Sequence, residues 1–149
     1  MNKGLNAYKQ VGIKDQIATA DPHRIIQMLM QGALDRMAQA KGAIERKNFA
    51  EKSQHISKAM AIVHALRDSV KPVDGAEEVS GNLIALYEFI SEQLQNANAD
   101  NRTQALVDAA SILATIKEGW DSIPVEEKEK VFGGNQTDNV QMTASAGAY

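Results

Sequence analysis

The sequence contains no cysteine, and this absence excludes a disulfide framework, thiolate chemistry and cysteine-ligated zinc. A chain without disulfides fits a reducing compartment such as the cytoplasm. Residues 1–20 lack the apolar run of a secretory signal, and no later stretch approaches the ~18 uncharged apolar residues that a membrane span needs. The sequence therefore predicts a soluble, cytoplasmic protein that does not insert into membranes.

Aromatic residues and strand-like patterns are also scarce. Aromatics make up 5% of the chain, and β-branched residues never alternate with polar ones over a strand-length run. Lys and Arg are spread along a chain whose formal net charge is −3, so no basic block exists to neutralise a phosphate backbone. We expect an all-α protein that does not bind nucleic acid.

Helical periodicity is what the sequence has in abundance. A first helix begins after Asp21, a good N-cap, and Pro22 occupies the first helical position, where its missing N–H costs nothing. Three more apolar stripes with helical spacing follow, separated by short polar turns, and we assign each to the core. The second runs from Phe49 to Val70, the third through Val79, Leu83, Leu86, Ile90, Leu94 and Ala97, and the fourth lies within residues 105–120. Four amphipathic helices joined by short turns predict an antiparallel up-down four-helix bundle.

Both ends of the chain lie outside the predicted bundle, which covers residues 21–123. Residues 1–20 carry Tyr8, Ile13 and Ile17 in a mostly polar setting that is too weakly periodic to form a stable helix alone. We interpret this segment as an N-terminal strap that lies across an apolar surface. Residues 124–149 have the Gly, Asn, Ser and Thr content of a flexible, disordered tail.

The patterns of known catalytic and metal sites are missing. A di-iron site in a four-helix bundle needs Glu-x-x-His motifs, and none occurs. The sequence also offers no support for a Ser-His-Asp triad or a Gly-rich phosphate loop. We therefore predict no catalytic residue, no metal and no cofactor, and hence a protein that is not an enzyme.

His55 provides the alternative to that interpretation. The segment "HISKA", which begins at His55, resembles the His-x-x-Lys-Gly motif of histidine phosphotransfer domains, which are also four-helix bundles. In those domains an exposed histidine carries the phosphoryl group. Ala59 replaces the usual glycine here and would crowd an approaching response regulator. An ordinary histidine at the edge of the apolar face is therefore the favoured interpretation.

Several predicted helices have more apolar surface than one helix-helix seam requires. Met28 lies almost opposite the core stripe of its helix, and Phe89 lies about 120° from the core stripe of the third helix. Ile112 and Ile116 form a second line about 100° from the core line of the fourth helix. Either a tight bundle and the strap cover these side chains, or they form a docking groove for helices of another chain. Self-association through the same patches is a further alternative.

Four segments in order resemble the flagellar secretion chaperone family (FliS). They are "AYKQV", "TADPHRIIQMLMQGALDRMAQAKGAI", "NLIALYEFISEQLQNAN" and "KEGW", and the resemblance covers about residues 5–122. The resemblance implies a cytoplasmic chaperone that binds the C-terminal helical segment of flagellin, prevents its polymerisation and delivers it to the flagellar export gate. It also implies that flagellin wraps around the bundle in helical pieces and that the strap moves to allow this.

The resemblance also places partner-binding residues by position. The family's strap tyrosine corresponds to Tyr8, its Leu-Tyr pair in the third helix to Leu86 and Tyr87, and its closing tryptophan to Trp120. With the apolar residues outside the core stripes, the predicted partner-binding set is Tyr8, Ile13, Ile17, Met28, Leu86, Tyr87, Phe89, Ile112, Ile116 and Trp120.

Overall fold

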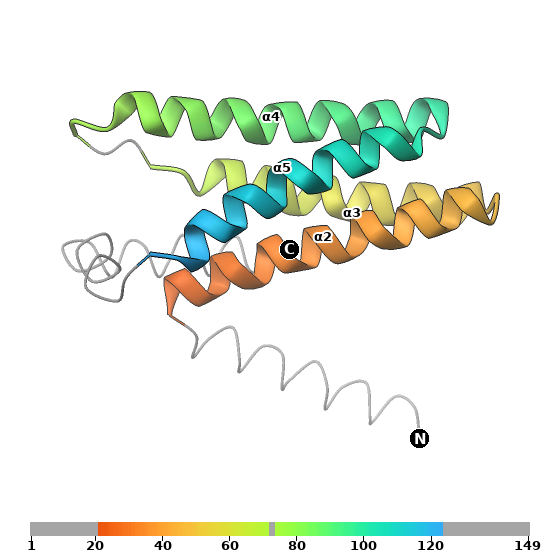
Figure 1. The fold of residues 1–149 in the computed structure, drawn as a ribbon, viewed down its shortest axis with the longest axis horizontal. Helices are drawn as coiled ribbons and strands as arrows, with labels where there is room; N and C mark the ends of the chain where they lie inside the picture. Colours follow the sequence, from red (N-terminus) through yellow and green to blue (C-terminus); the bar gives the residue numbers. More distant parts are fainter. Residues whose placement is uncertain (1–20, 72–73, 124–149) are drawn as a thin grey trace, which may run out of the picture.

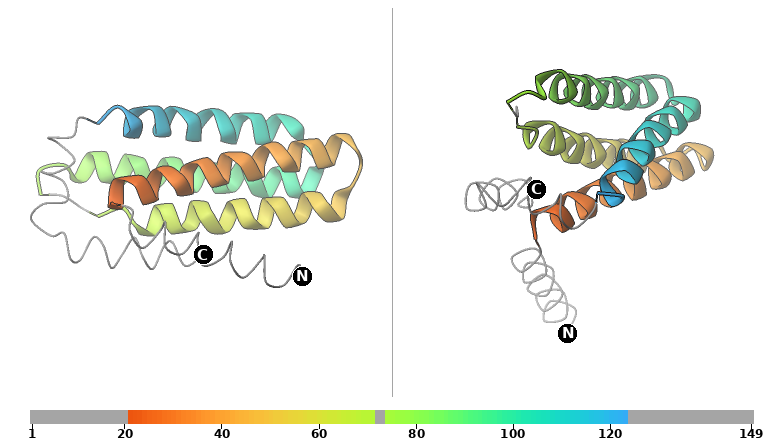
Figure 2. Two further views of the ribbon diagram at one scale, coloured as in Figure 1. Left: turned by 90° about the horizontal axis from the view of Figure 1, so that it is seen from below. Right: turned by 60° about the vertical axis from the view of Figure 1, so that its left-hand side comes forward.

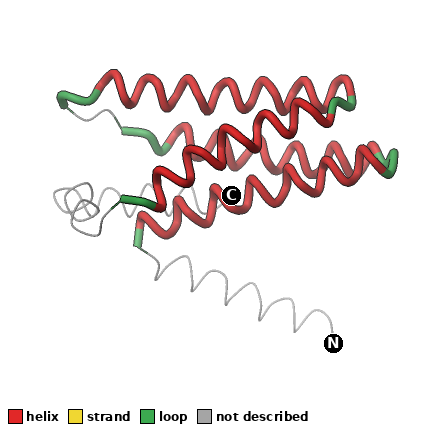
Figure 3. Tube along the Cα trace, in the orientation of Figure 1, coloured by secondary structure: helices red, strands yellow, loops and turns green. Residues whose placement is uncertain are grey.

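The computed structural model describes residues 21–71 and 74–123, which form four α-helices and no strand. The helices are α2 (Pro22–Glu45), α3 (Phe49–Asp68), α4 (Glu77–Asp100) and α5 (Thr103–Asp121). Consecutive helices run in opposite directions (Figure 1), and the turns between them are short (Figure 3). Each helix packs against two others, in the ring α2–α3–α4–α5–α2. The predicted all-α up-down bundle is confirmed.

Neither predicted end segment falls within this description. The strap, residues 1–20, and the tail, residues 124–149, lie outside the described residues. No helix of the described part of the chain is long and apolar enough to cross a membrane.

Side-chain caps fix the starts of the first two helices, and the first of them, Asp21, is the cap that the sequence predicts. Asp21 accepts a hydrogen bond from the backbone N–H of Arg24 at 2.8 Å. Asn48 caps α3 in the same way, since its side-chain oxygen accepts from the N–H of Glu51 at 3.2 Å. Lys47 makes the turn between α2 and α3 with a φ of 59°, in the left-handed region. Each cap satisfies an N–H that the first helical turn otherwise leaves unpaired.

The core fills the space between all four helices. Its largest fully buried side chains are Met30, Met37, Ile56, Val63, Leu66, Ile90, Leu94, Leu106 and Leu113. Every one of the four predicted stripes contributes to this set. Burial of a large apolar side chain contributes about 1.5–3 kcal/mol, so these positions account for most of what holds the helices together.

Three residues that the spacing assigned to core stripes are exposed instead: Phe49, Val79 and Leu86. The prediction was wrong there because periodicity does not show where a neighbouring helix ends. Phe49 is the first residue of α3, and Val79 lies in the first turn of α4, beyond the reach of the other helices. Leu86 lies at the edge of α4, where α5 diverges from it.

The divergence of α5 is the feature of the fold that matters most for the surface. Helix α5 lies beside α4 at the turn that joins them and beside the start of α2 at its other end (Figures 1 and 2). In α4, Ile90 and Leu94 are therefore fully buried, whereas Leu83 is only partly buried and Leu86 is exposed. The first half of α4 lacks the cover that α5 gives to its second half.

Candidate partner-binding surface

Apolar side chains that the core does not cover gather on one flank of α4. Leu86 and Phe89 are 42% and 43% exposed. At 3.6 residues per turn they lie on the flank of α4 away from Asn98. The Asn98 side chain accepts a hydrogen bond from Ser53 of α3 at 3.0 Å, which shows that its flank faces α3. Leu86 and Phe89 therefore lie on the side toward α5.

The matching flank of α5 carries Ile112 and Ile116, both partly buried. Asp121 marks the other flank, since its carboxylate accepts a hydrogen bond from Gln27 of α2 at 2.7 Å. The helical repeat places the two isoleucines well away from Asp121, on the side toward α4. We call this surface the α4–α5 apolar face. It consists of Val79, Leu83, Leu86, Phe89, Ile112 and Ile116.

His23 and Trp120 hold the far end of α5 against α2. Their rings are stacked, with centroids 4.9 Å apart and planes 8° from parallel. Nε2 of His23 donates to the backbone carbonyl of Trp120 at 2.8 Å, and the indole N–H of Trp120 donates to the carbonyl of His23 at 3.0 Å. A carbonyl oxygen only accepts, so the proton lies on Nε2. The pair keeps the end of α5 beside α2 and away from the start of α4.

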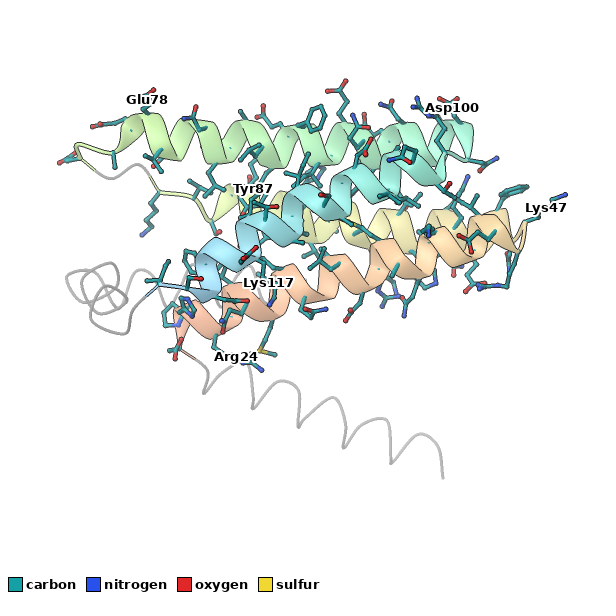
Figure 4. The ribbon with its side chains drawn as sticks, in the orientation of Figure 1. Arg24, Lys47, Glu78, Tyr87, Asp100 and Lys117 are labelled. Carbon is teal, nitrogen blue, oxygen red and sulfur yellow. The ribbon has the colours of Figure 1, made fainter. Side chains whose placement is uncertain are left out.

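Hydrogen bonds between polar side chains lie next to this stack, on the side of α5 that faces α2. Asp121 accepts from the Lys117 ammonium and from the Gln27 amide, each at 2.7 Å. The hydrogen bond from Lys117 is the main cause that lowers the pKa of Asp121 below its usual value, and the bond from Gln27 lowers it further. Figure 4 shows Lys117 between α5 and α2. This side of α5 is thus sealed by charged and amide groups, whereas the α4 side is apolar.

Four of the ten predicted partner-binding residues lie on the α4–α5 apolar face: Leu86, Phe89, Ile112 and Ile116. Tyr87, by contrast, is 2% exposed and points from α4 into the bundle (Figure 4). Its burial raises the pKa of its hydroxyl to about 12. In this conformation Tyr87 is a core residue and does not contribute to the exposed surface of α4.

The remaining predicted residues lie elsewhere. Met28 lines a depression of about 340 Å³ between α2 and α5, beside Arg24 and Lys117. Trp120 is partly buried against His23 at one end of the bundle. Tyr8, Ile13 and Ile17 lie outside the described residues. The structure therefore brings Leu86, Phe89, Ile112 and Ile116 together, buries Tyr87 and leaves Met28 and Trp120 on the α2 side.

His55 does not present a free ring nitrogen. Its side chain is only 15% exposed. Nδ1 accepts from the Arg36 guanidinium at 3.1 Å, and Nε2 lies 3.4 Å from a carboxylate oxygen of Glu51. A phosphoryl carrier needs an accessible nitrogen, so this geometry does not support phosphotransfer. Residues 21–71 and 74–123 also contain no cluster of three or more His, Asp or Glu side chains that could hold a metal ion.

The two halves of the bundle have charges of opposite sign, which the net charge of the whole chain did not reveal. Residues 21–71 contain nine Lys and Arg against five Asp and Glu, whereas residues 74–121 contain two against nine. Helix α4 has five acidic residues and no basic one. The salt bridges of the described residues lie within single helices or between the end of α2 and α3, so none joins the halves. Counting charge helix by helix, rather than over the whole chain, would have revealed this.

Known proteins match the chain over all four helices. The model of the family described as "Flagellar protein FliS" matches residues 4–127. The flagellar secretion chaperone FliSB of Pseudomonas aeruginosa is 44% identical over 121 residues, which are 81% of this chain and 95% of that protein. The flagellar secretion chaperone FliS of Vibrio cholerae is 40% identical over 126 residues, with 85% and 92% covered. The FliS of Salmonella typhimurium is 31% identical over 121 residues, with 80% and 89% covered.

Proposed function

This chain belongs to the FliS family of flagellar proteins, and from that premise we propose that it is a cytoplasmic export chaperone for flagellin. It binds the C-terminal helical segment of flagellin, prevents premature polymerisation and aids delivery to the flagellar export apparatus. Its action is binding and release, without catalysis.

The α4–α5 apolar face is the observation that carries this proposal. An amphipathic helix laid beside the first half of α4 would cover Leu86 and Phe89 with its apolar stripe, as helix-in-groove partners do. Such a helix would pack against the part of α4 that α5 leaves uncovered. A patch on the order of 300 Å² contributes about 7 kcal/mol when buried, before the costs of association are subtracted.

Burial of the same stripe accounts for the chaperone action. A flagellin segment whose apolar stripe lies on α4 and α5 cannot offer that stripe to another flagellin. Because the contact is apolar and made by flanks rather than by a closed cavity, the segment can also be released without unfolding the bundle.

The substitution Ile116→Asp tests the proposal. Ile116 is partly buried on the α4–α5 apolar face, so a charge there should be tolerated by the free protein but not by an apolar partner. In a calorimetric titration with a flagellin C-terminal peptide we expect the affinity to fall at least about tenfold, with little change in melting temperature.

Val107→Asp is the matched control, because Val107 is an exposed apolar residue on the other flank of the same helix. It should leave the affinity unchanged. If Ile116→Asp unfolds the protein, Ile116 belongs to the core. Leu86→Asp, at the exposed edge of α4, then tests the proposal in its place. Unchanged affinity in the folded variants would contradict the proposal.

A further inference from the structure

Carboxylates border the α4–α5 apolar face on its α4 side. Every third residue of a helix is rotated by about 60° around the helix axis. Leu86 therefore lies at the edge of the core, Phe89 farther from it, and Glu92 on the side that faces solvent. Glu92 is exposed, and so is Glu78. Glu78 is aligned with Phe89 three turns earlier on the same flank. The outer margin of the apolar stripe on α4 is therefore acidic.

The α5 side has the same sign. Asp108 lies one turn before Ile112 and is exposed; its carboxylate accepts a hydrogen bond from Gln104 of the same helix at 2.9 Å. Lys117 is the one basic residue of α5, and it bonds to Asp121 on the α2 side. No lysine or arginine of α4 or α5 thus neutralises the margins of the face.

Within the described residues, Glu78, Glu92 and Asp108 take part in no salt bridge. A cation placed along this margin would gain attraction from several carboxylates at once. An acidic or a neutral helix would gain only the apolar contact.

We propose that the α4–α5 apolar face selects helices whose apolar stripe is flanked by lysine and arginine. This inference rests on the proposed chaperone function and adds the charge of the bound segment. The apolar residues supply the affinity, and Glu78, Glu92 and Asp108 determine which amphipathic helices bind.

A partner helix fits this face better than the basic half of a second copy does. Among the described residues, Phe49 is the one large apolar side chain exposed on α2 or α3. That half of the molecule therefore offers positive charge without an apolar stripe to cover Leu86 and Phe89. The occupant must supply both features on one surface.

Three designed peptides of about 20 residues test the inference with the full-length chain. They share one leucine stripe and differ only in the flanking residues, which are Lys, Gln or Glu. We expect the Lys-flanked peptide to bind about tenfold more tightly than the Gln-flanked one at about 50 mM salt, and the Glu-flanked one to bind most weakly. At about 500 mM salt this preference should shrink to less than about threefold, because the charges are exposed and screened.

Paired substitutions locate the effect. Glu78→Gln with Glu92→Gln should reduce the preference for Lys flanks from about tenfold to about threefold or less and leave the affinity for the Gln-flanked peptide unchanged. Asp35→Asn with Glu45→Gln removes the same number of exposed carboxylates from α2, away from the face, and should leave the preference intact. Equal affinities for the three peptides, or a preference that Glu78→Gln with Glu92→Gln leaves unchanged, would overturn the inference.

A flagellin C-terminal peptide measured with the same variants separates this inference from the proposed function. If flagellin binds but ignores both pairs of substitutions, the chaperone function stands and the charge selection is overturned. If the Lys-flanked peptide behaves as expected and flagellin does not bind, the charge selection stands and the flagellin partner is wrong. A dimer at low salt that Glu78→Gln with Glu92→Gln dissociates would assign the face to a second copy and overturn the inference.

Discussion

The α2–α3 pair caps its helix starts with side chains, whereas the α4–α5 pair leaves its helix starts without side-chain caps. Asp21 and Asn48 cap α2 and α3, but the residues that precede α4 and α5, Ala76 and Arg102, make no side-chain cap. An N-cap contributes about 1 kcal/mol, so the first pair is the better stabilised locally. The second pair depends on the core it shares with the first.

The same contrast holds for exposed side chains. The α2–α3 pair has an excess of positive charge and little apolar surface, and the α4–α5 pair has an excess of negative charge and exposes Val79, Leu86, Phe89 and Val107. In the function proposed above, one half is thus the scaffold and the other the surface for a partner. The comparison teaches that apolar spacing alone does not distinguish core from binding surface, since both halves have it.

The largest effect we expect separates core from surface within α4. Leu94 is fully buried, so Leu94→Ala should lower the free energy of unfolding by about 2–5 kcal/mol. Leu86→Ala removes the same atoms from an exposed position and should cost less than about 1 kcal/mol, while it weakens flagellin binding. Urea unfolding of the two variants measures this. Similar losses would show that the Leu86 flank is core, and the contrast between the halves would fail.

Tyr87 provides a second test of burial in α4. The unfolded side chain ionises near its ordinary pKa of 10.0, and the folded one near a pKa of about 12. Between these values the unfolded chain releases a proton that the folded chain retains, so the free energy of unfolding falls as the pH rises. The loss begins near pH 10 and amounts to about 2 kcal/mol by pH 12.

Tyr87→Phe has no hydroxyl to ionise and is the control for that experiment. Its unfolding free energy should decline less between pH 10 and pH 12 than that of the parent protein. Parallel declines in both proteins would show that Tyr87 is accessible to solvent.

The sequence sufficed for the features that depend on neighbours in the chain. The start of α2 follows from Asp21 and Pro22, and the turn before α4 follows from the Asp74-Gly75 pair, where Gly75 has a φ of 86°. The stripes on all four helices follow from spacing. The core and the order of the helices were therefore predictable.

The candidate surface depends on contacts between distant residues, and here the prediction was only partial. Leu86 is exposed because α5 diverges from α4, and that divergence accompanies the stacking of His23 on Trp120, 97 residues apart. Tyr87 is buried because the α3-facing flank of α4 is part of the core, which the stripe through Leu83 and Leu86 did not show. Neither fact can be derived from the spacing on one helix.

Lys52 tests how the two halves are joined. It is buried, and its ammonium donates to the carbonyl of Asn98 at 2.8 Å and to the side chain of Asn101 at 2.6 Å, at the C-terminal end of α4. A positive charge there also suits the negative end of the helix dipole. Lys52→Met should lower the free energy of unfolding by about 2 kcal/mol, because it leaves these acceptors unpaired.

Lys58→Met is the matched control, since Lys58 is exposed on the same helix. It should change stability by less than about 0.5 kcal/mol. If the two variants unfold at the same denaturant concentration, the buried ammonium does not hold the halves together.

The smallest effect concerns whether the chain covers its own apolar face when no partner is bound. Residues 1–20 were interpreted as a strap with few apolar anchors, among them Tyr8, Ile13 and Ile17, all outside the described residues. A segment with so few anchors gains little on its own and is easily displaced. If it competes for the face, the apparent affinity for flagellin is reduced by the fraction of time that the face is covered. Deleting residues 1–17 should then raise the affinity about threefold, in a calorimetric titration, with the melting temperature of the bundle unchanged. A clear drop in affinity at the same melting temperature would mean that the strap contacts bound flagellin, and the α4–α5 pair would then not be the whole of the binding surface.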